Sequence, residues 1–307
     1  MANSIAYAQI FQQALDTQLV AGATSGWMEA NAGQVIYNGG NEIKIPKINM
    51  DGMANYNRNT GFTQGGVNLS YETMTLTQDR GRTFSLDAMD VDESNFVATA
   101  SNVMSEFQKT LVIPEIDAYR YSKMATLAIA GSQAEGGYTP VASDILSKLK
   151  ADIAKVKDVV GDIPLVITMS SLTKNILETS SEISKQLVVN DFVSGAYSTK
   201  VVMVDDCPIV AVPSARLKTA YIFNDGVTAG QTAGGFVADT NAKNINWIIS
   251  AQQSPIAISK TDTIRIFDPL INQTANAYKL DYRKYHDIFI PDNKMKGIFV
   301  NIKEALA

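Results

Sequence analysis

The sequence predicts an α+β protein with several parts too long for one compact domain, and three patterns indicate this class. Residues 67–89 (VNLSYETMTLTQDRGRTFSLDAM) alternate in short runs, as strands do. Fully extended, such a stretch would reach roughly 75 Å, against roughly 17–20 Å for an ordinary strand. Residues 94–130 repeat apolar side chains at helical spacing, and residues 140–235 alternate helix and strand patterns.

Composition limits the classes of function. The chain has 307 residues, 46% hydrophobic, which is enough to build a core, and only 19% charged, which suits a surface buried against copies of itself. Its net charge of −5 disfavours a broad phosphate-binding face, so sequence-specific nucleic-acid binding is not expected. No apolar run reaches membrane-spanning length, and no basic residue precedes Lys44 as a secretory signal would require. We therefore expect no membrane association and residence in a cytoplasm.

The first 91 residues predict an arm and an extended loop. Residues 1–41 begin with a short amphipathic helix and continue as a glycine-rich arm, which we expect to be anchored at Trp27 and Tyr37. In residues 42–91, a strand with Pro46, which favours a sheet edge, is joined by the polar tip 49–66 to the stretch 67–89. The result is a long hairpin, and a change of alternation phase between Tyr71 and Met74 indicates a bulge or bend. An isolated ribbon is marginal in water, so the hairpin should lie on another surface.

The rest of the chain predicts a long helix, an α/β unit and terminal strands. The helix should be kinked or interrupted at Pro114 and end at Gly131. The α/β unit should contain a helix capped by Ser143, a buried strand near 163–170, a helix from about 171, and strands at 200–204, 208–212 and 219–223. Strand patterns return in residues 262–307.

Side chains with catalytic or metal-binding chemistry are few. The single histidine, His286, lies in a strand pattern and is predicted to be half-buried and paired with Asp287 or a backbone carbonyl, and the single cysteine, Cys207, is predicted to be buried. Sites built from several His or Cys residues are excluded by count, and no glycine pair lies in a phosphate-binding motif. An acidic cluster could hold a hard cation, but we favour a role in charging and capping the start of the long helix; its members are Asp87, Asp90, Asp92 and Glu93. We expect no enzyme activity, cofactor or metal.

Arg80 and Arg82 flank Gly81 within the extended loop. A guanidinium group binds carboxylates through two parallel hydrogen bonds, so both are candidates for pairing with carboxylates elsewhere. Simple solvation is the alternative.

Read in chain order, these elements resemble the major capsid protein of tailed bacteriophages, which has the Hong Kong 97-type fold. Three segments carry the resemblance: YNRNTGFTQGGVNLSYETMTLTQDRGRTFSLDAMDVDESNF (56–96), VIPEIDAYRYSKMA (112–125) and YRKYHDIFIPDNKMKGIFVNIK (282–303). The resemblance implies an N-terminal arm (1–41), an extended loop (42–91), a peripheral domain made of a spine helix (92–139) and terminal strands (262–307), and an axial α/β domain (140–261).

The resemblance also implies a function. Copies should self-assemble as pentamers and hexamers into an icosahedral or prolate shell of a virion, formed in the host bacterial cytoplasm, that encloses double-stranded DNA without sequence-specific contacts. The extended loop should rest on a neighbouring subunit. The residues expected at subunit interfaces are Trp27, Tyr37, Asn55, Tyr56, Asn57, Arg58, Phe62, Arg80 and Arg82.

Two departures from the family pattern refine these expectations. No lysine occurs between Lys47 and Lys109, so covalent cross-linking through a loop-tip lysine is not expected. The chain does not begin with a charged helical pre-segment, so we expect a separate scaffolding protein, besides portal and decoration proteins. Two alternatives stay open: an encapsulin-like compartment, which would recruit a cargo enzyme, and an α/β enzyme built on residues 140–235, which would need a pocket of convergent titratable groups.

Overall fold

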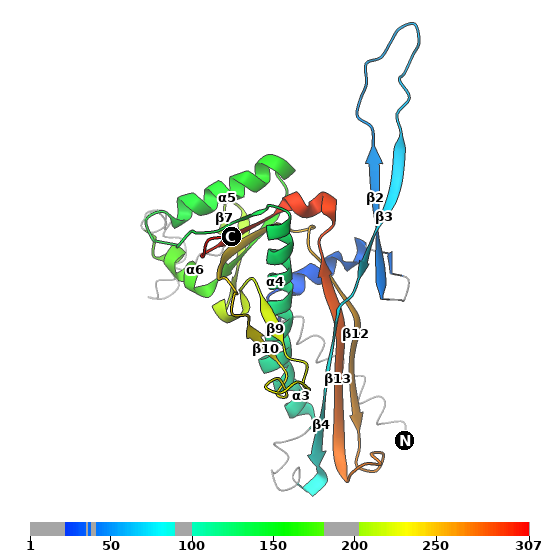
Figure 1. Cartoon of the computed structure of the whole chain (residues 1–307), viewed down its shortest axis with the longest axis vertical. Helices are drawn as coiled ribbons and strands as arrows, with labels where there is room; N and C mark the ends of the chain where they lie inside the picture. Colours follow the sequence, from blue (N-terminus) through cyan, green and yellow to red (C-terminus); the bar gives the residue numbers. More distant parts are fainter. Residues whose placement is uncertain (1–21, 35, 38–40, 90–99, 181–202, 307) are drawn as a thin grey trace, which may run out of the picture.

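The computed structural model of the chain describes residues 22–34, 36–37, 41–89, 100–180 and 203–306. Figure 1 shows an α/β part beside a long helix and a long sheet, with a two-stranded hairpin projecting from the end of that sheet. The described strands form four separate sheets, and helices and strands mix along the chain, so the predicted α+β class is confirmed. The helix predicted at the N-terminus and the acidic residues 90–93 lie outside the described residues.

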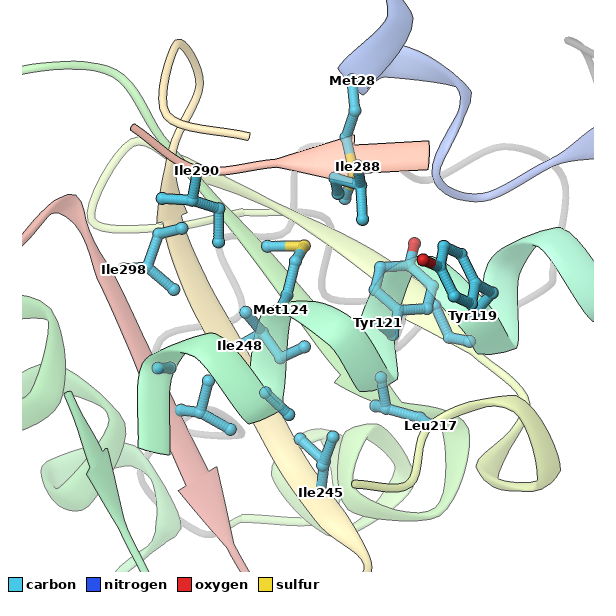
Figure 2. Close-up of a cluster of buried hydrophobic side chains, with 14 of the residues drawn as sticks. Met28, Tyr119, Tyr121, Met124, Leu217, Ile245, Ile248, Ile288, Ile290 and Ile298 are labelled. Atoms are coloured by element: carbon cyan, nitrogen blue, oxygen red, sulfur yellow. The ribbon is translucent and has the colours of Figure 1, made fainter. Parts of the chain in front are cut away.

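The α/β part is built on a six-stranded sheet. Its strand order is β5 (Ala134–Glu135), β14 (Ile298–Ile302), β11 (Ile245–Ala251), β6 (Leu165–Ser170), β8 (Cys207–Val212) and β7 (Met203–Val204). Helices α5 (Ile145–Val160) and α6 (Ser171–Glu178) pack on one face, and α4 (Ile113–Ala130) packs on the other. Successive residues of a strand point to opposite faces, so Trp247 and Ile249 of β11 pack towards α5 while Ile248 packs towards α4. Figure 2 shows the α4 side, where Met124 lies close to Ile248 and Ile298.

The long sheet has three antiparallel strands in the order β12 (Ile256–Phe267), β13 (Ala277–Phe289) and β4 (Gln78–Asp87). Helix α3 (Ala100–Phe107) packs on it through Met104, which meets Leu280 and Tyr282. A π-helical turn, η2 (Gln108–Val112), joins α3 to α4. Pro114 falls in the first turn of α4, directly after η2, and Gly131 caps the end of α4. The predicted interruption is thus a π-turn rather than a break in the rod.

The projecting hairpin consists of β2 (Glu42–Met50) and β3 (Val67–Thr75). The strand β1 (Ile36–Tyr37) pairs only with Ile43 and Lys44 of β2. From Pro46 outwards no second strand of the described residues pairs with the other edge of β2, which agrees with the edge position predicted for that proline. The register runs unbroken from Glu42 opposite Thr75 to Met50 opposite Val67, so of the bulge or bend predicted between Tyr71 and Met74 the bulge is wrong.

The long extended stretch is divided at Leu76 and Thr77. Its first part, β3, belongs to the hairpin, whereas its second part, β4, pairs along its whole length with β13. Leu76 is buried, and its carbonyl oxygen accepts a hydrogen bond from the Tyr285 hydroxyl at 3.0 Å. Residues 78–87 thus lie on the body of their own chain.

Other differences concern the α/β part. The cap predicted at Ser143 is wrong, because Asp144 occupies the N-cap position of α5 and makes no side-chain cap bond. Strand β11 was not predicted, although it lies in the middle of the sheet. Cys207 is buried as predicted. The remaining elements are the pair β9 (Tyr221–Phe223) and β10 (Phe236–Ala238), and the 3₁₀ helices η1 (Gly26–Gln34), η3 (Ser214–Arg216) and η4 (Asp292–Gly297).

Candidate interaction surfaces

The tip of the hairpin, residues 51–66, is held by its own short contacts. The Gly66 amide donates to Asp51 Oδ2 at 2.7 Å, and Asn57 and Gly61 exchange two backbone hydrogen bonds. Gly61 has a φ of +84°, which a glycine adopts without strain. The rings of Tyr56 and Phe62 meet edge to face at 4.9 Å between centroids. The tip is therefore a shaped surface rather than an arbitrary loop.

This tip brings together five of the sequence-predicted interface residues. They are Asn55, Tyr56, Asn57, Arg58 and Phe62, and all five are exposed. Phe62 is 90% exposed, and the nearby Met53 is fully exposed. Contact between water and such large apolar side chains is unfavourable, so burial against a partner would lower the free energy. Nothing among the described parts of the same chain covers this tip, which projects beyond the body (Figure 1).

The stem of the hairpin exposes further apolar side chains that sequence reasoning did not single out. Each is more than half exposed; they are Ile48, Met50, Val67, Leu69 and Tyr71. The alternation within 42–50 and 67–75 predicts strands, but the sequence alone does not indicate which side of the hairpin these side chains share.

The root of the hairpin is fixed by a buried carboxylate. Asp287 is fully buried, and its oxygen atoms accept hydrogen bonds from the Thr77 amide and hydroxyl, both at 2.9 Å, and from the Tyr119 hydroxyl at 2.8 Å. Lys123 forms an ion pair with the same carboxylate. Burial, together with the Asp287 charge, raises the pKa of Tyr119, so its hydroxyl stays a donor. These contacts set the point where β3 ends and β4 begins.

Arg80 and Arg82 have different surroundings in the structure. Arg80 donates from Nε to Glu115 Oε1 at 2.7 Å and from its other nitrogens to the carbonyl oxygens of Asn224 and Gly235. Its predicted carboxylate partner is thus found in its own chain, because β4 lies on the body and not in the projecting hairpin. Arg82 is exposed, and among the described residues its guanidinium group donates only to the carbonyl oxygen of Thr232, through long hydrogen bonds of 3.4 and 3.5 Å.

Both arginines line a cleft of about 450 Å³ between β4, the η2–α4 junction and the connection from β9 to β10. His286 also lines this cleft but is buried, and burial, followed by the nearby cations, holds its pKa well below 6.5. Its Nδ1 atom has no hydrogen-bond partner among the described residues, and Asp287 is engaged by Thr77, Tyr119 and Lys123 instead. Within the described ranges there is no group of three or more His, Cys, Asp or Glu side chains arranged to hold a metal.

The segment around η1 is fastened to the body. Arg120 of α4 is fully buried and binds Glu29, with 2.5 Å between Nη2 and Oε1, and Asp117 accepts four hydrogen bonds from Thr24 and Ser25. Trp27, a predicted interface residue, packs partly buried against the main core. Tyr37 pairs through its backbone with Ile43. Trp27 thus contacts the body as an anchor would, and the buried charges of α4 were not predicted from the sequence.

A second exposed apolar turn lies at the opposite end of the molecule. It joins β12 to β13, at the end of the long sheet remote from the hairpin tip (Figure 1). Leu270 and Ile271 of this turn are exposed. Among the helices that the structure describes, none has both the length and the apolar content to cross a bilayer.

No protein-family model matches the chain. No curated protein gives a significant sequence match. Solved structures do match: the capsid structure of the cyanophage P-SCSP1u has a TM-score of 0.58 at 12% identity over 86% of this chain and 83% of that chain. The mature capsid of bacteriophage PhiM1 has a TM-score of 0.52 at 13% identity, over 87% and 83% of the two chains.

A virus-like particle from Pyrococcus furiosus has a TM-score of 0.51 at 8% identity and covers 96% of this chain and 99% of that chain. Agreement over most of both chains, with an arm, a projecting hairpin, a long helix and an α/β part in the same molecule, identifies the architecture. The chain has the α+β, Hong Kong 97-type fold of phage capsid structures.

Proposed function

We propose that this chain is the major capsid protein of a tailed double-stranded DNA bacteriophage. Its copies assemble as pentamers and hexamers into a closed shell around the genome. Its role is structural and depends on many repeated weak contacts instead of chemistry at one site. The virion is its final location, and assembly takes place in the bacterial cytoplasm.

The observation that carries this proposal is the projecting hairpin on a fold shared with phage capsids. The hairpin exposes aromatic and aliphatic side chains at its tip and stem, away from its own body. An isolated two-stranded ribbon is marginal in water, and apolar surface of this extent is stabilised by contact with another chain. Because all copies are identical, a hairpin that binds a neighbour generates a ring or a filament, and a shell is built from closed rings.

Apart from Tyr37, whose backbone pairs with Ile43 of its own chain, the predicted interface residues divide into two groups under this proposal. Residues Asn55, Tyr56, Asn57, Arg58 and Phe62 of the tip, together with Arg82, are candidates for contacts with a neighbouring copy. Trp27 and Arg80 act mainly within their own chain, where Trp27 packs on the core and Arg80 binds Glu115. We keep the proposed division of the chain into arm, extended loop, peripheral domain and axial domain. Two strand pairs cross its boundaries: β4 of the extended loop pairs with β13 of the peripheral domain, and β14 of the peripheral domain pairs with β11 of the axial domain.

The partners follow from the same proposal. A separate scaffolding protein guides assembly, a portal occupies one vertex, and decoration proteins bind the outside. The net charge of −5 suits a container that encloses DNA without holding it tightly.

One observation favours a second candidate, an encapsulin-like compartment. The virus-like particle from Pyrococcus furiosus matches nearly the whole of both chains. A compartment would recruit a cargo enzyme through a terminal peptide, whereas a virion shell would need scaffold and portal. Purified particles that carry an enzyme and form without scaffold would favour the compartment.

Removing the tip of the hairpin tests the proposal. Deletion of residues 53–65 leaves Gly52 and Gly66 for a short turn and should yield a soluble, folded subunit that no longer forms shells. Electron microscopy and size-exclusion chromatography, with the scaffolding protein co-expressed, measure assembly, and circular dichroism checks the fold. Shells of normal shape from the deletion variant would argue against the role of the hairpin. Failure of the unmodified chain to assemble under any of these conditions would argue against a shell protein altogether.

A further inference from the structure

The register of the hairpin assigns each of its side chains to one of two faces. Alternate residues of a strand point to opposite sides, and residues paired across two strands share a side. We call the side that leans on the body the inner face and the opposite side the outer face. The inner face carries the pairs Ile43–Met74, Ile45–Glu72, Lys47–Ser70 and Asn49–Asn68. The outer face carries the pairs Lys44–Thr73, Pro46–Tyr71, Ile48–Leu69 and Met50–Val67.

At the root, the inner face is apolar and is buried on its own body. Ile43 and Ile45 are buried in a cluster with Ile256 and Phe289, and Met74 packs against it. The next inner-face residues still touch the body through polar groups. Lys47 lies 3.8 Å from an oxygen of Asp292, whose amide donates to Glu72 Oε2 at 3.3 Å. The outer face at this level is polar, with Lys44 opposite Thr73.

Beyond Pro46 the apolar side chains change faces. The outer face becomes fully apolar, while the inner face becomes polar, with Asn49 opposite Asn68. Both strands make this change at the same level, and the backbone register between them has no bulge. The phase shift visible in the sequence is therefore a change in which face is apolar. A ribbon that only needed to stay in solution would have no reason to carry such a row of apolar pairs.

We propose that the distal outer face of the hairpin is the docking surface for a second copy of this chain, and that the distal inner face stays in water. The proposal rests on the shell function above and adds which face is buried. The body formed by the described residues of the same chain lies on the opposite side of the ribbon and does not cover this surface. The residues of this surface are Pro46, Ile48, Met50, Val67, Leu69 and Tyr71.

The size of the surface explains why the contact works only in an assembly. A two-stranded face about 17 Å long and about 10 Å wide covers on the order of 200 Å². A standard stable interface buries about 800 Å² on each partner. One hairpin contact alone is thus too small to hold a dimer, but repetition around a closed ring adds the contacts together.

Matched charge substitutions on the two faces test the proposal. Ile48→Asp with Leu69→Asp places two carboxylates on the outer face, and Asn49→Asp with Asn68→Asp places two at neighbouring positions on the inner face. All four sites are exposed in the subunit, so the unfolding midpoint of both double variants should match that of the unmodified chain. We expect loss of particles for the outer-face variant and normal particles for the inner-face variant. Normal particles from the outer-face variant, or loss from both, would overturn the assignment of one buried face.

Chemical labelling gives a second readout that does not depend on breaking the assembly. The single native cysteine is buried, so a cysteine introduced by Ile48→Cys or by Asn49→Cys is the accessible thiol. We expect maleimide labelling of Ile48→Cys to be strongly slowed in particles relative to dilute subunits, and labelling of Asn49→Cys to be unchanged. The reverse pattern, or equal labelling of both in intact particles, would refute the proposed face while leaving the shell function standing. Absence of particles from the unmodified chain would instead count against the shell function.

Discussion

At the residue scale, the Asp287 carboxylate connects several segments at the root of the hairpin. It is fully buried, and its partners come from the residue just before β4, from α4 and from its own strand: Thr77, Tyr119, Lys123 and the amide of Ile288. A buried charge is tolerated only when it is paired and hydrogen-bonded, and Asp287 meets both conditions. One side chain thereby joins the end of the hairpin to the long helix.

Replacing Asp287 should therefore be costly. Asp287→Ala leaves the Lys123 ammonium and the Thr77 amide without their acceptor, and we expect a loss of about 3 kcal/mol in the free energy of unfolding. Urea denaturation of the subunit measures it. Arg283→Ala, which removes an exposed ion pair with Asp79, is the control and should cost less than about 1 kcal/mol. Equal losses for both variants would contradict the role assigned to Asp287.

His286 predicts a pH dependence of stability. Burial holds its pKa in the folded subunit well below 6.5, so below pH 6.5 the unfolded chain binds a proton that the folded chain does not. The stability from the neutral imidazole is thus present above pH 6.5 and lost as the pH falls, by up to about 1.4 kcal/mol per pH unit. His286 is the only histidine, so few other groups titrate in this window.

Urea denaturation at pH 7.5, 6.5 and 5.5 tests this linkage. We expect the unmodified subunit to lose about 1 kcal/mol between pH 6.5 and 5.5, and His286→Phe to lose much less over the same interval. Parallel pH curves for the two proteins would show that the imidazole is not buried in its neutral form.

At the scale of elements, β4 and β13 lie close together where Gly81 faces Tyr282 and Arg283. A Cβ atom at Gly81 would lie 2.8 Å from the carbonyl oxygen of Tyr282, a distance at which the backbone has to shift. Gly81→Ala should push the strands apart and destabilise the subunit by about 1–3 kcal/mol in urea denaturation. Gly52→Ala in the hairpin tip, where a Cβ would meet nothing within 4 Å, should stay within about 0.5 kcal/mol of the unmodified chain. If Gly81→Ala left the free energy of unfolding unchanged, the two strands would have to lie further apart than in the structure.

At the scale of the whole molecule, the two exposed apolar turns lie at opposite ends, and the subunit carries a net charge of −5. Apolar contacts then favour assembly, while like charges on the copies oppose it. Each contact is small, so assembly should begin sharply at a threshold concentration, below which the subunit is a folded monomer.

Salt should move this threshold. Added salt shortens the Debye length from about 30 Å at 0.01 M to about 8 Å at 0.15 M, which screens the repulsion between copies but leaves apolar contacts in place. With the scaffolding protein present at a fixed ratio, we expect the threshold concentration, followed by light scattering, to fall as sodium chloride rises over this range. The chain lacking residues 53–65 should not scatter at any of these concentrations. A threshold that rises with salt would indicate that ion pairs, and not apolar contacts, hold the copies together.

Much of the fold could be predicted from the sequence, because it depends on local periodicity. The period of apolar residues predicted the long helix, the extended stretches and the α/β part, and the polar, glycine-rich composition of 49–66 predicted an exposed tip. The burial of Cys207 followed from its apolar neighbours. The tip residues of the candidate interface could also be predicted from the sequence, because the polar, glycine-rich composition around them indicates an exposed loop.

Only the tertiary structure decided where the long stretch divides, and which groups Arg80 and Arg82 bind. Thr77 is bound by a residue 210 positions away, and Arg80 by Glu115 on the long helix, contacts that no local pattern encodes. The phase shift in 67–89 was visible in the sequence, but its meaning depended on the register with β2, which shows that the apolar side chains change faces. By itself, the sequence determined the elements and their exposed character. The tertiary structure decided which side of the hairpin its own body already occupies, because side-chain direction follows from strand pairing and not from order along the chain.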